Sequence, residues 1–265
     1  DRAEQYLHRL AVQGSRVVPA LELLVQVYEQ ANDWAQALQT NRRLEASSGE
    51  ARQERAAHYC CEQADRQARE GQTAAALQRL REARQLDPRS VRARLQMAAL
   101  LEKRGDTAAA IVLLREVVDL DARFLTEALP GLRRCHEQEQ RLDAYASWLA
   151  SLAAPAELPP AAVIAQAELS RETGLDPQPL LAASLAHKPS WTVLQALLER
   201  LELAPGHRLG EALQGMRSAL QTAAGRLPRY RCDHCGLMPS LLFWQCPNCK
   251  RWGSIAPKIN WIGEP

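Results

Sequence analysis

The apolar positions of the first 225 or so residues follow helical spacing. Val91, Leu95, Ala98 and Leu101 recur at i, i+4, i+7 and i+10, which places their side chains on one face of an α-helix. Strand-like alternation is nearly absent here. Polar stretches with Gly or Pro interrupt the pattern at 47–50, 69–72, 86–90 and 103–107. The pattern therefore predicts a series of α-helices joined by short turns.

The interruptions recur at a fixed distance in the middle of the chain. Four pairs of residues lie 34 positions apart: Gly71 and Gly105, Ala76 and Ala110, Leu80 and Leu114, and Asp87 and Asp121. A period of 34 residues, with a turn glycine and a small residue five positions later, resembles the tetratricopeptide repeat. In that repeat two antiparallel helices form one unit, and the small residue lets them approach closely.

The repeat extends toward the N-terminus with a longer step. Tyr28 closes a first helix, Trp34 takes the aromatic position and Ala37 takes the small position. The distance from Asn32 to Gly71 is 39 residues, so this repeat carries about five extra residues.

The repeat becomes irregular toward the C-terminus. Ala144 and Trp148 lie 34 residues after Ala110 and Leu114, and Glu139 stands where a turn glycine is expected. A proline-rich connection is predicted at 154–162, followed by helical pairs at about 160–188 and 190–223.

One helical pair buries only part of its apolar surface, so neighbouring pairs must stack to complete a core. We therefore predict an all-α tetratricopeptide-repeat solenoid over 1–225, followed by a small C-terminal β module over 226–265. The alternative is an unrelated helical bundle, which the 34-residue repetition disfavours.

Composition excludes several classes of protein. The net charge is +2 over 265 residues, so no global field attracts nucleic acid or acidic lipid. No stretch approaches the roughly 18 apolar residues of a membrane span, and no secretory signal is present. The chain begins at Asp1 rather than Met, so we expect that an N-terminal targeting or anchoring segment is missing. Seven cysteines, an odd number, do not suggest a disulfide framework.

Four of the cysteines form two C-x-x-C pairs, Cys232 with Cys235 and Cys246 with Cys249. Two such turns complete a tetrahedral site of four thiolates, which suits zinc or iron. Gly236 follows the first pair, where positive φ is common, whereas Lys250 takes the matching position after the second. A thioredoxin-type redox pair is the alternative, but no βαβ unit accompanies these cysteines.

We expect the cysteine module to be a β-ribbon tied by metal. Residues 240–245 have strand character, 238–240 supply a turn, and 229–232 form the partner strand. Three tryptophans, at 244, 252 and 261, lie in the last 22 residues. They either dock the module against the last helices, which we favour, or form a patch that binds a partner.

Motifs of catalysis are absent from the sequence. The six histidines show no ligand spacing. Cys60, Cys61 and Cys135 are interpreted as small residues that pack helices together. The sequence thus predicts a protein that is not an enzyme.

Two alternative functions remain open from the residues alone. Residues 226–258 carry six basic residues and one acidic residue, a net charge of +5 that Zn²⁺ with four thiolates would lower to about +3. Such a basic ribbon could bind nucleic acid, with Phe243 or Trp244 stacking on bases, but that function leaves the repeats unexplained. A site of four thiolates with iron could instead transfer electrons as rubredoxin does.

The stretch "YRCDHCGLMPSLLFWQCPNCKRWGSIAPKI", at 230–259, resembles the rubredoxin-like module of the lipopolysaccharide assembly protein B (LapB, or YciM) family. In that family the module follows tetratricopeptide repeats, and the order here is the same. The resemblance implies a structural zinc, with iron as the alternative, held by the four paired cysteines.

The resemblance also implies a function. Members of this family are adaptors anchored by an N-terminal helix at the cytoplasmic face of the bacterial inner membrane. They promote degradation of the deacetylase LpxC by the membrane protease FtsH, and the membrane protein YejM (PbgA) opposes them. No nucleic acid is expected as a partner, and homo-oligomers are left open.

A helical repeat array presents a long groove to a partner. From the repeat register, the basic residues expected to face this groove are Arg69, Arg92, Lys103 and Arg133. These cations could bind acidic side chains of a protein partner through charge-assisted hydrogen bonds. The alternative is that each is a solvated surface residue.

Overall fold

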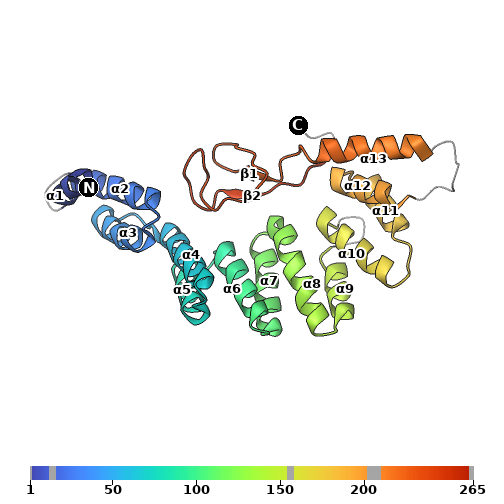
Figure 1. The fold of residues 1–265 in the computed structure, drawn as a ribbon, viewed down its shortest axis with the longest axis horizontal. Helices are drawn as coiled ribbons and strands as arrows, with labels where there is room; N and C mark the ends of the chain where they lie inside the picture. The colour runs from blue at the N-terminus through green and yellow to red at the C-terminus, as the bar shows by residue number, and fades with distance from the viewer. Residues whose placement is uncertain (1, 12–15, 154–157, 202–209, 263–265) are drawn as a thin grey trace. The chain divides into compact units, whose positions relative to one another are not determined.

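The computed structural model describes residues 2–11, 16–153, 158–201 and 210–262 (Figure 1). Within these residues it contains thirteen α-helices and one two-stranded sheet. The predicted fold class, tetratricopeptide-repeat helices followed by a small C-terminal β module, is confirmed. Internal contacts divide the chain into two compact units, Asp1–Glu116 and Val117–Pro265. The second unit contains the C-terminal module together with several helices.

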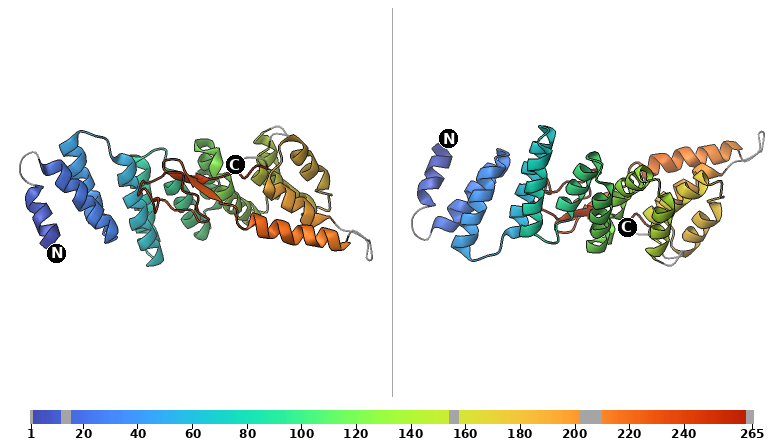
Figure 2. Two further views of the ribbon diagram at one scale, coloured as in Figure 1. Left: turned by 90° about the horizontal axis from the view of Figure 1, so that it is seen from above. Right: turned by 90° about the horizontal axis from the view of Figure 1, so that it is seen from below.

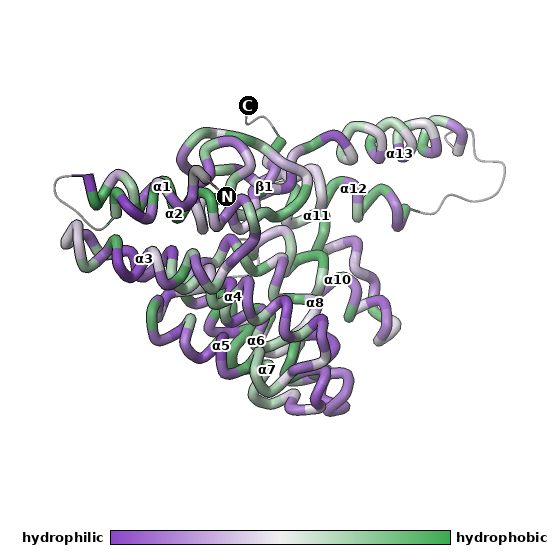
Figure 3. The backbone as a smooth tube through the Cα atoms, turned by 60° about the vertical axis from the view of Figure 1, so that its left-hand side comes forward, coloured by the Kyte–Doolittle hydropathy of each residue, from purple (hydrophilic) through white to green (hydrophobic). Residues whose placement is uncertain are grey.

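The first unit consists of helices that pack as antiparallel neighbours (Figures 1 and 2). It contains α1 (Arg2–Leu10), α2 (Val17–Gln30), α3 (Trp34–Ser48), α4 (Gln53–Arg69), α5 (Thr73–Leu86), α6 (Val91–Lys103) and most of α7 (Thr107–Leu120). The apolar run of α7 is drawn largely in green in Figure 3. Within each pair, small and branched apolar side chains are buried between the two helices.

The turns of the first unit confirm the predicted repeat. Asn32, Gly71 and Gly105 each join two helices of a pair with positive φ, at 54°, 78° and 80°. Five residues after each turn residue lies an alanine with no exposed surface: Ala37, Ala76 and Ala110. The left-handed turn and the buried alanine together set how closely the two helices approach.

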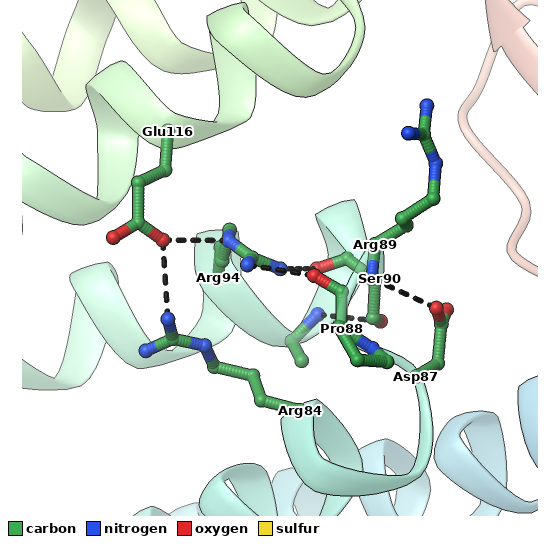
Figure 4. Close-up of polar contacts among 8 residues, drawn as sticks. Arg84, Asp87, Pro88, Arg89, Ser90, Arg94 and Glu116 are labelled. Carbon is green, nitrogen blue, oxygen red and sulfur yellow. Dashed lines mark hydrogen bonds and ion pairs between the residues drawn. The ribbon is translucent and has the colours of Figure 1, made fainter.

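A buried arginine fixes the loop between α5 and α6 (Figure 4). Arg94 donates to the carbonyl oxygens of Pro88 at 2.7 Å and Ser90 at 3.0 Å, and its Nε lies 2.7 Å from Glu116 Oε2. Arg84 contacts the same carboxylate oxygen at 3.1 Å. Backbone carbonyls beyond a helix end have no N–H partner within the helix. The Arg94 guanidinium supplies hydrogen-bond donors to the carbonyls of this loop instead.

The second unit continues the helical pairs and adds the ribbon (Figure 1). Its elements after α7 are the 3₁₀ turn η2 (Ala122–Phe124), α8 (Leu125–Gln138), α9 (Leu142–Ser151), α10 (Pro160–Glu172), α11 (Gln178–His187), α12 (Trp191–Arg200), α13 (Gly210–Ala224), β1 (Tyr230–Cys232) and β2 (Ile255–Pro257). The predicted connection at 154–162 lies partly outside the described residues. The helical pair predicted from about 160 begins where expected, because α10 starts at Pro160. No helix among the described residues is both long and apolar enough to cross a bilayer.

The repeat register between α8 and α9 differs from the prediction by one residue. Positive φ occurs at Gln140 (54°) rather than at Glu139, so the turn lies 35 residues after Gly105. The residue five positions later is therefore Tyr145, which is buried and stacks on His136 at 5.7 Å between ring centroids. Ala144 does not take the small position. A large side chain fills that position and packs between α8 and α9.

The sheet of the C-terminal module differs from the predicted ribbon. β1 pairs in antiparallel fashion with β2, with Tyr230 opposite Pro257 and Cys232 opposite Ile255. The strand predicted at 229–232 is confirmed, but the strand predicted at 240–245 is wrong. That segment forms a loop, in which only Gln245 makes an isolated bridge, to Trp252. Leu242 packs against the small apolar cluster of the module and Trp244 stacks on Phe124, whereas Leu241 and Phe243 are exposed.

Candidate metal centre

Two turns with the same backbone geometry carry the four paired cysteines. Cys232 and Cys246 each donate their N–H to the carbonyl five residues later, at 2.8 Å in both turns. Each also accepts, on its carbonyl, the N–H four residues later, at 3.0 Å from Gly236 and 2.9 Å from Lys250. The residue directly after each C-x-x-C, Gly236 or Lys250, adopts a left-handed conformation. This conformation brings its N–H back to the carbonyl of the first cysteine and closes the turn.

The bend is left-handed in both turns. Gly236 has φ of 74° and Lys250 has φ of 59°. The second turn therefore adopts the same conformation without glycine, at a cost of about 1 kcal/mol for a residue with a Cβ. Lysine in place of glycine at position 250 therefore changes the energy of the second turn and leaves its geometry intact.

Replacing Lys250 by glycine is expected to stabilise the ribbon by about 0.5–1 kcal/mol, because the left-handed strain disappears while the unfolded chain gains some freedom. The measurement is the urea midpoint of ribbon unfolding, followed by tryptophan fluorescence at a fixed concentration of zinc chelator. The matched control is Gly236→Lys, which introduces the same strain in the first turn and should lower the midpoint. A lower midpoint for Lys250→Gly would contradict the expectation.

The four sulfur atoms converge on one point. All Sγ atoms lie within 4.8 Å of one another, with 3.8 Å from Cys232 to Cys249 and 3.6 Å from Cys235 to Cys246. Thiolates about 2.3 Å from a tetrahedral ion lie about 3.8 Å apart, so these distances fit such an ion. Among the described residues, this is the group of potential ligands that converges in this way. The four cysteines therefore form a metal-binding site.

Hydrogen bonds around the sulfurs favour thiolates. Burial raises the pKa of Cys232, but the Ser254 hydroxyl, 3.3 Å from its Sγ, and the N–H groups of His234 and Cys235 lower it to about 6. Burial raises the pKa of Cys246 to about 11, despite N–H groups that point toward its sulfur. Four sulfurs so close together repel one another as thiolates, and a bound cation removes that repulsion.

The ribbon docks against η2 and the start of α8 through three contacts. The rings of Phe124 and Trp244 stack at 5.9 Å between centroids and 6° between planes. Arg123 Nη1 lies 2.8 Å from Oδ2 of Asp233, a residue inside the first cysteine turn. Tyr230, on β1, donates its hydroxyl to Glu127 at 2.8 Å.

A second contact lies beside α12. The N–H of Trp191 donates to the Asn260 carbonyl at 3.2 Å, and the N–H of Ile262 donates to the Pro189 carbonyl at 2.9 Å. Lys188 Nζ lies 4.0 Å from the centroid of the Trp261 ring. Trp244 and Trp261 thus contact the helices, as the docking interpretation predicted. Trp252 pairs within the ribbon.

Two of the basic residues predicted to bind partners share one hollow in the first unit. Arg69, at the end of α4, and Lys103, at the end of α6, line a hollow of about 260 Å³. Ala68, Ala99 and Leu100 form its apolar part.

Arg92 and Arg133 are engaged within the protein. The Arg92 side chain is only 2% exposed, and its Nη2 lies 2.8 Å from Glu62 Oε1, so it is not the open cation that the register suggested. Arg133 contacts Glu137 at 2.7 Å and Glu168 at 3.4 Å, and it also pairs with Glu172. Arg133 thereby joins α8 to α10.

The remaining cysteines pack helices, as predicted. Cys60, Cys61 and Cys135 have no exposed surface. Burial raises the pKa of Cys60 and of Cys61 to about 12, which keeps both thiols protonated. They are therefore unsuited to ligate metal or to act as nucleophiles.

Sequence reasoning did not find the residues that hold the ribbon in place. Arg123 and Asp233 are 110 positions apart, and Glu127 and Tyr230 are 103 positions apart. Each pair combines ordinary surface residue types, so no local pattern distinguishes them. Only the fold shows that they meet.

Helical pairs of this period, followed by a ribbon with four converging cysteines, define a tetratricopeptide-repeat protein with a C-terminal metal-binding domain. Residues 67–128 match the tetratricopeptide repeat family, and residues 230–257 match the family described as rubredoxin metal binding domain. Both matches fall on the elements described above.

Curated relatives align with nearly the whole chain. The chain is 27% identical to lipopolysaccharide assembly protein B of Escherichia coli (strain K12), over 97% of this chain and 67% of that protein. It is 26% identical to the protein of the same name from Haemophilus influenzae, over 98% of this chain and 66% of that protein. The predicted resemblance to the lipopolysaccharide assembly protein B family is thus confirmed. A solved structure, the MamA protein, shares 13% identity over 72% of this chain and all of that chain, with a TM-score of 0.40, which is too low to bear on function.

Proposed function

We propose that this protein is a non-enzymatic adaptor that limits lipopolysaccharide synthesis by promoting FtsH-dependent proteolysis of the deacetylase LpxC. One observation carries the proposal: the similarity to lipopolysaccharide assembly protein B extends over 97% of the chain and includes both the repeats and the metal-binding module. The adaptor acts at the cytoplasmic face of the bacterial inner membrane. YejM (PbgA) opposes it there.

The helices supply surfaces for partners. Arg69 and Lys103 flank the hollow between α4 and α6, and no carboxylate among the described residues forms an ion pair with either. Cations in this setting suit acidic side chains of a client protein. Arg92 supports this surface by joining α6 to Glu62 on α4.

The metal in this proposal is a structural zinc held by Cys232, Cys235, Cys246 and Cys249. Zinc supplies no redox chemistry and stabilises folded turns, which suits a ribbon with so small an apolar core. Purified protein should be colourless and contain one equivalent of zinc. Visible iron–thiolate absorption with reversible redox cycling would instead support electron transfer, the alternative function.

The adaptor function is testable in E. coli cells depleted of their own lipopolysaccharide assembly protein B. The chain is expressed behind a membrane-spanning helix, and the half-life of LpxC is measured with active and with inactive FtsH. Anchored chain should shorten the LpxC half-life only when FtsH is active. An unchanged half-life, together with no co-purification of LpxC or FtsH at near-native salt, would refute the proposal.

The same cells test the two cations of the hollow. Arg69→Glu with Lys103→Glu should lengthen the LpxC half-life, because the reversed charges repel acidic clients. Arg66→Glu, on the exposed side of α4 and outside the hollow, is the matched control and should leave the half-life as in the parent. If Arg66→Glu lengthens the LpxC half-life as much as the Arg69→Glu, Lys103→Glu pair does, the effect comes from net charge rather than from this surface.

A further inference from the structure

The second unit contains a cavity that the metal site does not use. It has a volume of about 440 Å³ and lies where α8, α10 and the C-terminal ribbon meet. The ribbon contributes residues from both strand ends, including Tyr230 and Pro257. A space of this size holds one large apolar side chain together with part of a polypeptide backbone.

Two helix faces form the apolar wall. On α8 the lining residues follow i, i+3, i+4 spacing, and on α10 they do the same: Thr126, Leu129 and Pro130, then Ala161, Ile164 and Ala165. Ile259, on the ribbon, lines the cavity and is 38% exposed. The cavity is thus an open, mainly apolar hollow.

A proline in α8 alters the backbone beside this wall. Pro130 lies inside the helix and has no N–H, so the helix cannot supply the usual i+4 donor to the Thr126 carbonyl. Thr126 and Pro130 both line the cavity.

The two acidic side chains that line the cavity have polar partners within the protein, whereas two of the basic side chains have no ion-pair partner among the described residues. The acid Glu127 accepts the Tyr230 hydroxyl, and Glu168 contacts Arg133. In contrast, Arg229 and Lys258 line the cavity without an ion-pair partner among the described residues. They are neighbours on the ribbon, because the Lys258 N–H donates to the Arg229 carbonyl at 2.8 Å. Two adjacent cations at the edge of an apolar hollow favour an anionic, apolar occupant.

We propose that this cavity binds an extended, acidic peptide segment of a protein partner. An apolar side chain of the segment enters between α8 and α10, and flanking Asp or Glu side chains lie against Arg229 and Lys258. The inference deepens the adaptor function proposed above by giving the chemistry of a bound segment. Its test uses neither LpxC nor FtsH, so either idea can fail alone.

The test begins with a phage library of random dodecapeptides selected against the zinc-loaded chain. Enriched sequences should place an aromatic or aliphatic residue within two positions of Asp or Glu. A fluorescein-labelled consensus peptide is then titrated by fluorescence anisotropy. Affinity should fall as salt rises, because exposed charges are screened.

Two independent variants test the site. Arg229→Glu with Lys258→Glu should weaken binding about tenfold or more, because like charges then face each other. Ile164→Trp, which fills the hollow from α10, should weaken binding about tenfold through steric exclusion. The matched control is Arg231→Glu on the same strand, whose side chain lies outside the cavity and which should change affinity less than about twofold. Zinc content and circular dichroism establish that each variant is folded.

Several results would overturn the proposal. Enrichment of basic peptides or of no peptides, or full binding by Ile164→Trp, would exclude an acidic segment in this cavity. Displacement of the peptide by dodecyl phosphate at a lower concentration than unlabelled peptide would assign the cavity to an amphiphile instead. An equal loss for Arg231→Glu and for the Arg229→Glu, Lys258→Glu pair would show that net charge, not this cavity, controls binding.

Discussion

Replacing Cys246 and Cys249 together by serine is expected to unfold the ribbon and release it from the helices. The two changes remove half of the metal ligands, and structural zinc sites contribute about 10–16 kcal/mol of apparent binding free energy. Two short strands and a small apolar cluster cannot replace that contribution. Far-UV circular dichroism should retain nearly all of the helical signal, because the helices lie outside the ribbon.

Metal content, tryptophan fluorescence and limited proteolysis measure this outcome. The variant should lose its metal, the emission of Trp244 should shift to the red as its ring leaves Phe124, and proteases should cut between 226 and 262. Cys60→Ala with Cys61→Ala is the matched control, since these cysteines are buried in α4 and are not among the four converging sulfurs. That control should keep its metal. A protease pattern in the serine variant equal to that of the parent would contradict the structural role of the metal.

Replacing Ala110 by leucine is expected to lower the free energy of unfolding by about 3 kcal/mol. Ala110 has no exposed surface and lies five residues after the left-handed turn at Gly105. Because this position is fully buried, extra methyl groups force side chains off their rotamers or move the backbone. The measurement is urea denaturation followed by circular dichroism.

The control for this prediction is Ala108→Leu in the same helix. Ala108 is exposed, so the same change there should alter the free energy of unfolding by no more than about 0.5 kcal/mol. Helix propensity is nearly equal for the two substitutions, which leaves packing as the difference. Equal stability of the two variants would mean that the repeat does not require a small residue at position 110.

Regular spacing made the repeats predictable. Each turn requires a residue that tolerates positive φ and, five positions later, a small buried residue. Glycine therefore recurs at 71 and 105, and alanine recurs at 76 and 110. The cysteine site was predictable for the same reason, because two ligands in one turn must stand two residues apart.

Long-range packing could not be predicted from these local patterns. The segment 240–245 is an apolar and aromatic run with strand character, yet it forms a loop: Trp244 stacks on Phe124, and β1 pairs with 255–257 instead. The shift from Glu139 to Gln140 depends on Tyr145 filling the space between α8 and α9. The cavity depends on Arg229 and Ile164, which are distant in sequence and become neighbours only through the fold.

The contact between Arg123 and Asp233 has a consequence for the order of folding. It closes a chain loop of 110 residues, and the ligand Cys249 follows it later still. During synthesis, α8 leaves the ribosome long before the second cysteine turn exists, and N-terminal parts of a chain fold first. The ring of Phe124, which Trp244 covers in the folded protein, is therefore bare in the nascent chain until the last cysteines emerge and capture metal. Newly made protein is thus most exposed to aggregation or chaperone binding in this interval, and metal supply should set how long the interval lasts.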